Sequence, residues 1–308
     1  MRVVIAGSSG LIGSALTTSL LADGHDVVRL VRRAPATDQN AAPSTSGHLT
    51  EAQWDPAAAH LASSALEGAD AVVNLAGAGV ADHRWTTAYK QQLRDSRILS
   101  TATLATAMAN LDKPPAVFVA GSAVGYYGET GETPTDESAG PGTDFLAHLC
   151  QEWEAAANPA ERAGIRVAHP RFGIVVTAAG GAFGKLLPLA RVGLGGKLGS
   201  GDQYWSCISL TDAVAALRYV ITTDTLHGPV NVTSPTPTTN REITAVIGEA
   251  LHRPTFFAVP GFALRLVIGG FAEGILMSQR IVPAKLQDAG FTFAHPTLAT
   301  ALAAALHA

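Results

Sequence analysis

The sequence predicts an α/β fold in which a doubly wound parallel sheet is followed by a smaller C-terminal lobe. Strand-like and helix-like segments alternate through the first half of the chain, a glycine-rich turn separates the first strand from the first helix, and the alternation stops after Arg171. With 308 residues, of which 47% are hydrophobic and 15% charged, the chain can bury a full core. This composition excludes a disordered protein.

The first half of the chain supplies the sheet. Residues 3–6 form a short β-branched run that ends at Gly7, which is typical of a strand buried on both faces. Helical spacing over 11–22 and a second apolar run at 26–31 then complete a β-α-β unit. The same reasoning predicts strands near Trp54 and at 71–75, 116–120 and 166–168, and helices at 86–109 and 143–163. About six parallel strands result, and connection rules make such a sheet right-handed and doubly wound.

The second half is predicted to form a smaller lobe. Gly180-Gly181 and the glycines between 193 and 201 mark loops, and the elements that follow are short: a helix near 212–221, a strand at 230–232, and a helix from about 240. Two or three short helices are expected after about residue 251. We therefore expect a nucleotide-binding domain at 1–172 and a substrate lobe at 173–308, with parts of 204–233 available to complete the first domain. The Ala- and Thr-rich stretch 34–50 resembles a flexible loop.

Charge and cysteine content narrow the classes of function. The formal net charge is −4, and no basic run is longer than Arg32-Arg33, which argues against a nucleic-acid-binding protein. No apolar stretch is long enough to cross a bilayer and no secretory signal is visible, so we expect no membrane partner and a cytoplasmic location. Two cysteines and ten histidines show no zinc-ligand spacing, so no metal is expected. The expected partner is a small molecule, and the oligomeric state stays open.

The strongest motif is the turn between the first strand and the first helix. It reads Gly7-Ser8-Ser9-Gly10-Leu11-Ile12-Gly13, a G-x-x-G-x-x-G in the setting of a dinucleotide fingerprint. Gly7 permits the tight turn, Gly10 leaves room for a pyrophosphate, and Gly13 lets the helix pack closely. The backbone from Ser9 to Ile12, including Leu11, offers N–H groups to the phosphates. A turn that only connects strand and helix would need one glycine.

The end of the second strand distinguishes the two nicotinamide dinucleotides. An acid there would bind the adenosine ribose and select NAD, but this chain has Arg32 and Arg33. Two guanidinium groups suit the 2′-phosphate of NADP(H). The alternative is a solvated arginine pair at a strand end.

Further motifs resemble those of a known family. They are Trp54-Asp55-Pro56, Asn74-Leu75-Ala76-Gly77, Arg84-Trp85, Asp95-Ser96-Arg97, the segment 122–128, the glycine cluster 195–201, and a tail with Pro260 and Pro283-Ala284-Lys285-Leu286. By these motifs the sequence resembles the short-chain dehydrogenase/reductase superfamily, in its extended, epimerase-like branch. It is closer still to a subgroup of poorly defined activity that has a short C-terminal domain. The resemblance covers nearly the whole chain and implies a Rossmann domain with a C-terminal substrate lobe.

The resemblance also implies cofactor contacts. Asp55, beside Trp54, would meet the adenine edge. Asn74, Leu75, Ala76 and Gly77 would line the cofactor beneath its ribose and pyrophosphate.

One departure from the family pattern bears on mechanism. The superfamily's catalytic Tyr-x-x-x-Lys belongs in the helix after Ser122, but residues 144–154 contain neither Tyr nor Lys. Aligning Glu154 with the acidic residue that usually follows the motif puts Leu146 and Cys150 at the Tyr and Lys positions. The usual acid/base mechanism therefore cannot be assumed, and the subgroup is known for lacking this pair.

Other residues are candidates for chemistry near the carboxyl ends of the strands. Ser122 is the first catalytic candidate, although alignment could shift its role to Ala123, and Tyr126 is the second, with packing as the alternative for either tyrosine of the pair. For substrate binding we predict Arg84, Trp85, Arg97 and Trp205, where the alternatives are surface arginines and core tryptophans. Cys150 is expected to be a buried structural thiol.

Two functions therefore compete. The leading hypothesis is an NADP-dependent oxidoreductase or epimerase-like enzyme acting on a small polar or nucleotide-linked substrate. The rival is a non-catalytic NADP-binding sensor. The missing dyad favours the sensor, whereas a second lobe containing Trp and Arg favours the enzyme. One sequence does not decide between hydride transfer and redox-neutral epimerisation.

Overall fold

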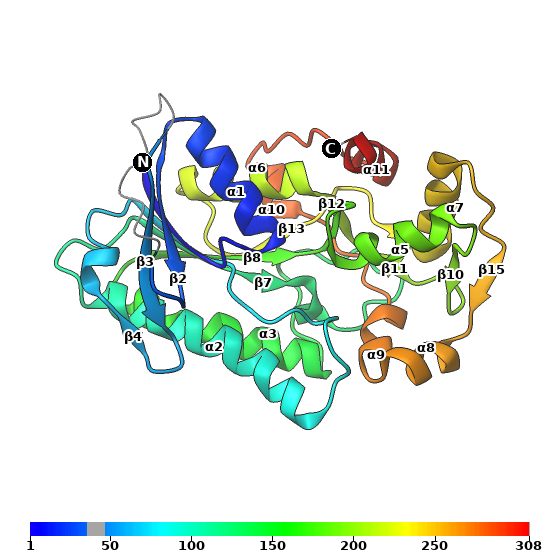
Figure 1. Cartoon of the computed structure of the whole chain (residues 1–308), viewed down its shortest axis with the longest axis horizontal. Helices are drawn as coiled ribbons and strands as arrows, with labels where there is room; N and C mark the ends of the chain where they lie inside the picture. Colours follow the sequence, from blue (N-terminus) through cyan, green and yellow to red (C-terminus); the bar gives the residue numbers. More distant parts are fainter. Residues whose placement is uncertain (36–46, 308) are drawn as a thin grey trace.

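A mostly parallel sheet forms the centre of the computed structural model, which describes residues 1–35 and 47–307. Within these residues the sheet has nine strands in the order β13-β8-β6-β5-β1-β2-β3-β4, with β7 beside β8 (Figure 1). Their bounds are β1 Arg2–Ala6, β2 Asp26–Val31, β3 Leu49–Asp55, β4 His60–Leu61, β5 Ala71–Asn74, β6 Val117–Ala120, β7 Ser122–Ala123, β8 Arg166–Phe172 and β13 Gly228–Val232. Only the β3–β4 pair is antiparallel. The predicted doubly wound sheet is confirmed.

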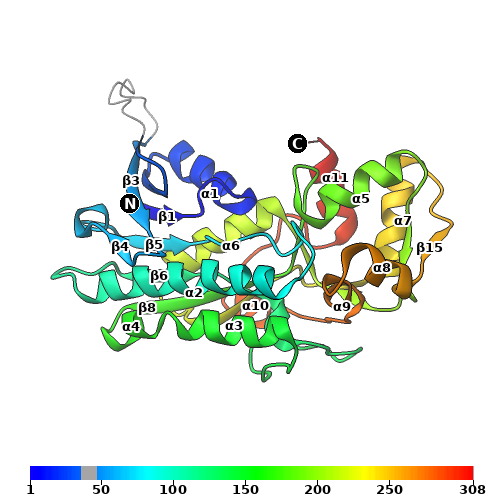
Figure 2. The same cartoon turned by 60° about the horizontal axis from the view of Figure 1, so that its bottom comes forward.

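Helices cover both faces of this sheet (Figure 2). On one face lie α1 (Leu11–Ala22), α6 (Leu210–Thr222) and α10 (Ala284–Asp288), packed against a core that includes Val3 and Ile5. On the other lie α2 (Thr87–Ala109), α3 (Phe145–Ala155) and α4 (Asn158–Arg162), packed against Val4 and Ala6. Alternate residues of β1 thus enter opposite cores, because side chains alternate across a strand. Because both faces of β1 are buried, its residues from Val3 to Ala6 are all apolar.

The helix predicted at 143–163 is two helices. The chain turns at Ala156 and Ala157 between α3 and α4, and Pro159 lies in the first turn of α4. Proline has no N–H to donate to the preceding turn, so a continuous helix through this point would lose a hydrogen bond. A proline in a first turn is tolerated, and a new helix starts there.

The seventh parallel strand comes from the second half of the chain. β13 pairs with β8 in register Val230↔Pro170 and forms the edge of the sheet, and α6 packs beneath it. Two parts of 204–233, α6 and β13, therefore belong to the sheet and its helical layer, whereas the two short strands within 204–209 lie outside it. The sequence predicts a strand at 230–232 but does not specify its neighbour in the sheet, because the surrounding glycine-rich loops suggest a separate lobe.

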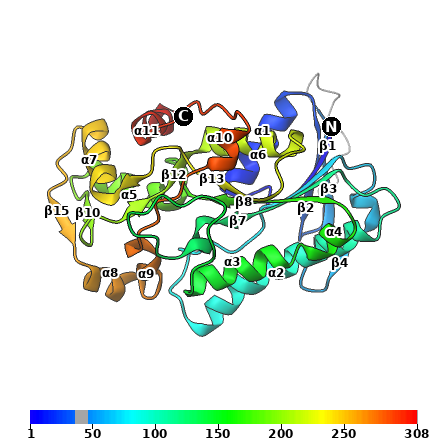
Figure 3. The same cartoon turned by 180° about the vertical axis from the view of Figure 1, so that it is seen from behind.

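The remaining elements form the second lobe, at the far end from β3 and β4 (Figure 3). They are β9 Ile174–Val176, α5 Gly181–Arg191, β10 Gly196–Leu198, β11 Tyr204–Trp205, β12 Cys207–Ser209, β14 Thr238–Thr239, α7 Asn240–Leu251, β15 Phe257–Val259, α8 Gly261–Ile268, α9 Phe271–Leu276 and α11 Leu298–His307. Phe183, Leu187 and Leu302 are fully buried in its own core. Thr239 and Glu242 form a capping box at the start of α7, close to the predicted start.

Two further predictions concern the loop at 34–50 and membrane-spanning helices. The loop predicted at 34–50 falls largely on residues 36–46, which lie outside the described ranges. Across the described ranges, no helix combines the length and apolar character needed to cross a membrane.

Candidate functional site

Two of the three glycines in the first turn are required by the fold itself. Gly7 has φ +79°, and a Cβ on it would lie 2.5 Å from the backbone carbon of Leu75. A Cβ on Gly13 would lie 2.2 Å from the carbonyl oxygen of Gly7. Both distances are far inside van der Waals contact, so the roles predicted for Gly7 and Gly13 agree with the packing.

Gly10 is different. Its φ is −76°, which any residue adopts, and a Cβ on it would meet only the Gly7 carbonyl oxygen at 3.3 Å. The conformation does not require glycine, and the one close contact, although tight, would be relieved by a shift of a few tenths of an ångström. The missing side chain leaves open space at the start of α1, where no side chain caps the helix and no acid lies in its first turn. Uncapped N–H groups and the helix dipole make this an anion-binding position.

The loop after β5 forms the wall opposite the glycine turn. Asn74 is fully buried, and its amide donates to Thr101 (2.9 Å) and Ser100 (3.2 Å) on α2 while its oxygen accepts from Ala76 N–H (3.1 Å). Asn74 therefore holds the loop in shape and leaves the Leu75–Gly77 backbone to line the site. Ala78 N–H donates to the Ser96 hydroxyl at 3.0 Å and fixes the next residue to the same helix.

Three arginines gather at the end of β2. Arg33 pairs with Glu51 at 2.7 Å, and Arg32 is exposed beyond the strand. Arg29, which the sequence analysis did not select, donates from Nε to the hydroxyl of Ser8 in the glycine turn at 3.1 Å. The available signal was a charged residue inside an otherwise apolar strand. These side chains put positive charge beside the ribose end expected for a dinucleotide.

Trp54 and Asp55 end β3, and their side chains have different surroundings. Trp54 is 3% exposed and packs in the core on the α2 side of the sheet, so its ring is covered by protein. The Asp55 carboxylate accepts from the N–H groups of Ala57 (3.0 Å) and Ala58 (3.3 Å) and shapes the turn before β4. Trp54 is thus a core residue, and the predicted adenine contact of Asp55 stays a prediction.

Ser122 is part of a buried ionic network. Its hydroxyl donates to Glu154 at 2.6 Å, and Arg171 donates to both oxygens of the same carboxylate at 2.8 Å. Ser122 is 2% exposed and Arg171 3% exposed. The Ser122 hydroxyl, predicted to face the cleft, is bonded to Glu154, because a largely buried carboxylate (13% exposed) requires hydrogen-bond donors.

The tyrosine pair joins the same network. Tyr127 accepts from Arg171 (2.9 Å) and donates to the Asn231 side chain of β13 (2.7 Å), and burial raises the pKa of Tyr127 to about 12. The ring of Tyr126 lies over the Arg171 guanidinium, with 3.4 Å between Cζ and the ring centroid. The Tyr126 ring thus stacks on a buried cation, and its side chain is partly exposed; its place beside the reacting ring of the cofactor stays a prediction.

The two positions that the Tyr-x-x-x-Lys pair would occupy are apolar and closely packed. A Cβ on Gly125 would lie 3.2 Å from Cβ of Leu146, and a Cβ on Gly274 of α9 would lie 3.3 Å from Leu146 Cδ1. Cys150 is buried, and its Sγ lies 3.7 Å from the Ala123 carbonyl oxygen. Burial raises the pKa of Cys150 to about 12. Neither side chain offers a proton at neutral pH.

Both cysteines are therefore expected to be unreactive in the native protein. Burial raises the pKa of Cys207 to about 12 as well, so both groups remain protonated thiols at pH 8, and the thiolate is the reactive form. Ellman's reagent should label neither residue at pH 8 in the native protein and both after unfolding in guanidinium. Rapid labelling of native Cys150 would show that this site is open.

Arg84 and Trp85 connect the loop after β5 to the second lobe. Arg84 donates to the Leu266 carbonyl at 3.2 Å, and the Trp85 ring lies between Phe145 and Phe271, at centroid distances of 5.2 Å and 5.5 Å. Lys185 of α5 adds a third link, to the Ala81 carbonyl at 2.6 Å. Arg84 and Trp85 therefore lie where the two lobes meet, and their contact with a substrate stays a prediction.

Trp205, the fourth predicted substrate residue, is a core residue of the second lobe. It is 5% exposed, and its indole N–H donates to the Ile275 carbonyl at 3.0 Å. The position next to a glycine cluster had suggested a pocket wall. The side chain instead anchors α9, because a buried indole needs an acceptor for its N–H.

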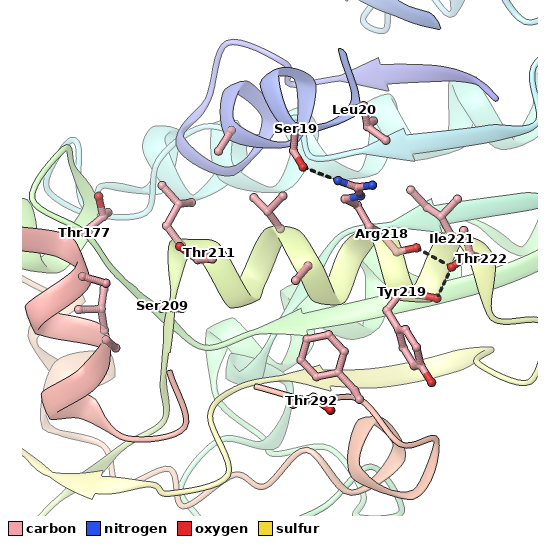
Figure 4. A pocket seen from close by; sticks show the side chains of 18 of the residues that line it. Ser19, Leu20, Thr177, Ser209, Thr211, Arg218, Tyr219, Ile221, Thr222 and Thr292 are labelled. Atoms are coloured by element: carbon pink, nitrogen blue, oxygen red, sulfur yellow. Dashed lines mark hydrogen bonds between the residues drawn. The ribbon is translucent and has the colours of Figure 1, made fainter. Parts of the chain in front are cut away.

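A cavity of about 820 Å³ lies away from this site, beside α1, α6 and α11 (Figure 4). Arg218 crosses it and donates to Ser19 at 2.7 Å. Neither the glycine turn nor the loop after β5 lines the cavity, so its volume does not identify the cofactor site. Within residues 1–35 and 47–307, no group of His, Cys, Asp and Glu is gathered in a way that suits a metal ion.

Comparison with known proteins assigns the chain to a family. Residues 3–233, which end one residue after β13, match the model described as the NAD dependent epimerase/dehydratase family. The chain belongs to the NAD dependent epimerase/dehydratase family. Residues 259–305 match DUF1731, a domain of unknown function. The resemblance to epimerase-family proteins with a short C-terminal domain is thereby confirmed.

Relatives of this epimerase-family chain match it from end to end. Epimerase family protein Mb2239 of Mycobacterium bovis is 48% identical over 301 residues, which cover 97% of this chain and 96% of the relative. The crystal structure of human epimerase family protein SDR39U1 (isoform2) with NADPH has a TM-score of 0.90 and 31% identity, and the match covers 100% and 99% of the two chains. A nucleoside-diphosphate sugar epimerase from Corynebacterium glutamicum has a TM-score of 0.79 and 33% identity, and 58% of its chain is covered.

Proposed function

We propose that this epimerase-family protein binds NADP(H) at the glycine turn and acts as an epimerase-like oxidoreductase on a small polar or nucleotide-linked substrate. The observation that carries the cofactor assignment is Gly10, whose backbone conformation does not require glycine and whose Cβ would make one tight contact, to the Gly7 carbonyl oxygen at 3.3 Å. A pyrophosphate at the uncapped start of α1 accounts for it. The human SDR39U1 structure with NADPH supports the same cofactor. Two buried, unpaired cysteines agree with a cytoplasmic location.

The choice of NADP(H) over NAD(H) rests on the arginines at the end of β2. Arg32 is exposed there, Arg33 is held by Glu51, and Arg29 reaches the glycine turn. A 2′-phosphate carries two negative charges that a guanidinium binds with charge-assisted hydrogen bonds. No catalytic step depends on this group. Contacts with the 2′-phosphate affect only the affinity and the orientation of the bound dinucleotide.

Arg32→Ala is expected to weaken NADPH binding by more than about tenfold, because a charge-assisted contact contributes roughly 1.5–3 kcal/mol. NADH lacks the phosphate, so its affinity should not change. Isothermal titration calorimetry with both dinucleotides measures the difference, with the exposed Arg162→Ala on α4 as a matched control. Equal NADPH affinity in wild type and Arg32→Ala would exclude Arg32 from the phosphate site.

When bound, a nicotinamide ring supplies hydride chemistry, and the residues of this chain hold and orient the reactants. Leu146 and Cys150 give no acid or base, so proton transfer would need another group near the cleft. Tyr126 is the candidate that we retain, because its side chain is partly exposed and it stacks on Arg171. Ser122 supports the site from behind, through Glu154.

The second candidate function is a non-catalytic NADP(H) sensor. The buried commitment of Ser122 and the apolar dyad positions favour it. Stopped-flow measurements of NADPH oxidation with a panel of carbonyl compounds and sugar nucleotides discriminate between the two functions. Turnover that falls in Tyr126→Phe supports the enzyme. Tight NADPH binding without turnover of any compound on the panel supports the sensor.

A further inference from the structure

Arg97 of α2 is a guanidinium without a carboxylate partner. Within the described residues, no Asp or Glu lies within salt-bridge distance of it, and its hydrogen bond to the protein runs from Nη1 to the Leu93 carbonyl at 3.1 Å. Its Cζ lies 5.1 Å from the ring centroid of Trp153. Burial lowers the pKa of Arg97. A guanidinium has five N–H donors, so most of its hydrogen-bonding capacity is unused by the protein.

The guanidinium lies against the cofactor loop. A Cβ on Gly77 would lie 3.2 Å from Arg97 Cζ and 3.3 Å from Nη1, so a side chain at position 77 would cover the cation. The charge of Arg97 also acts on the Cys150 thiol and the Tyr89 hydroxyl, which places it between α2 and α3 at the rim of the cleft. Cys150 occupies the position at which the resemblance puts a lysine. A positive charge is thus present beside that position, but it comes from α2.

We propose that Arg97 is the anion-binding residue of the cofactor cleft and that it binds a negatively charged oxygen delivered next to Gly77. The oxygen belongs either to the dinucleotide diphosphate or to a carboxylate or phosphate of the substrate. This inference rests on the proposed function, because the cleft is the one assigned there to NADP(H). Stacking on Trp153 holds the guanidinium plane, and a glycine at position 77 keeps the approach open.

The alternative role of Arg97 is purely structural. A partly buried cation without a counter-ion is unfavourable unless a ligand compensates its lost hydration. Arg171, which is more deeply buried at 3% exposed, has such compensation from within the protein, a bidentate carboxylate from Glu154. Arg97 has no such partner in the described chain, and this contrast is the reason to expect an external anion.

The test compares Arg97→Met and Arg97→Lys with Arg94→Met, a control one turn earlier on α2 whose side chain pairs with Glu152 at the surface. NADPH affinity is measured by calorimetry. Inorganic phosphate binding to each protein saturated with NADPH is measured by equilibrium dialysis. If the dinucleotide supplies the oxygen, Arg97→Met weakens NADPH binding by about tenfold or more, Arg97→Lys weakens it less, and Arg94→Met leaves it unchanged.

If the substrate supplies the oxygen, NADPH affinity is unchanged and Arg97→Met loses phosphate binding that the wild type retains. Wild-type behaviour of Arg97→Met in both assays overturns the inference while leaving the proposed function in place. Failure of the wild type to bind NADPH overturns the proposed function instead. If Arg97→Met does not fold, Arg97→Gln decides: it removes the charge but keeps a polar side chain, so unchanged binding in both assays also overturns the inference.

Discussion

Gly10→Val is expected to abolish NADPH binding and to leave the protein folded. The valine branches would occupy the open space at the start of α1, where the pyrophosphate is proposed to meet the backbone. The backbone at position 10 has an ordinary conformation, and the contact of an added Cβ with the Gly7 carbonyl oxygen at 3.3 Å needs an adjustment of only a few tenths of an ångström, so we expect the fold to tolerate the change. Calorimetry reports the loss of binding, and circular dichroism reports the retained fold.

Gly13→Val serves as the matched control. A Cβ there would lie 2.2 Å from the Gly7 carbonyl oxygen, so the backbone must move and the whole protein should be destabilised. The two glycines of one turn thus separate a ligand effect from a folding effect. A folded Gly10→Val protein that still bound NADPH with wild-type affinity would show that no phosphate lies against this residue.

Arg171→Met is expected to lower the free energy of unfolding by about 3–5 kcal/mol, the usual effect of leaving a buried charge unpaired. The variant would strand the Glu154 carboxylate, which is buried beneath Ser122, and would remove the donor to Tyr127. Tyr127 connects this network to β13, so the edge strand would lose support. Urea denaturation followed by tryptophan fluorescence measures the change.

Arg94→Met is the control for this experiment, because it also removes an arginine paired with a glutamate of α3. Both partners of that pair are 44% exposed, so we expect a change of less than about 1 kcal/mol. Equal stability changes in Arg94→Met and Arg171→Met would contradict the account of the Arg171–Glu154 pair as the centre of a buried network.

The fold was largely predictable because hydrophobic runs and turn residues are local signals. The six strands predicted in the first half, and the β-α-β unit that opens the chain, are present with nearly the predicted bounds. β13 was recognised as a strand, but its place beside β8 depends on a pairing some 60 residues apart, which no local pattern reports. The break between α3 and α4 carried a local signal in Pro159 that the helical periodicity masked.

The candidate site could be predicted from the sequence only where the backbone, and not a side chain, is expected to contact the ligand. The glycine turn is found from spacing, since Gly7 and Gly13 each meet a steric requirement of the same loop. Side-chain networks are different. Ser122 and Glu154 were both singled out from the sequence, yet their hydrogen bond joins residues 32 positions apart and turns a catalytic candidate into a supporting residue. Trp54 and Trp205 were predicted to be binding residues but lie in hydrophobic cores. The residues that pack around them come from distant segments of the sequence.

The measurement that tests this account most directly is a crystal structure of the protein grown with NADPH. We expect the pyrophosphate at the start of α1, within hydrogen-bonding distance of the backbone around Gly10. We expect the 2′-phosphate beside Arg32. We expect the nicotinamide to lie beside Gly77, Arg97 and the part of α3 that carries Leu146 and Cys150. NADPH bound instead in the cavity between α1 and α6, or bound with its phosphates away from Gly10, would contradict it.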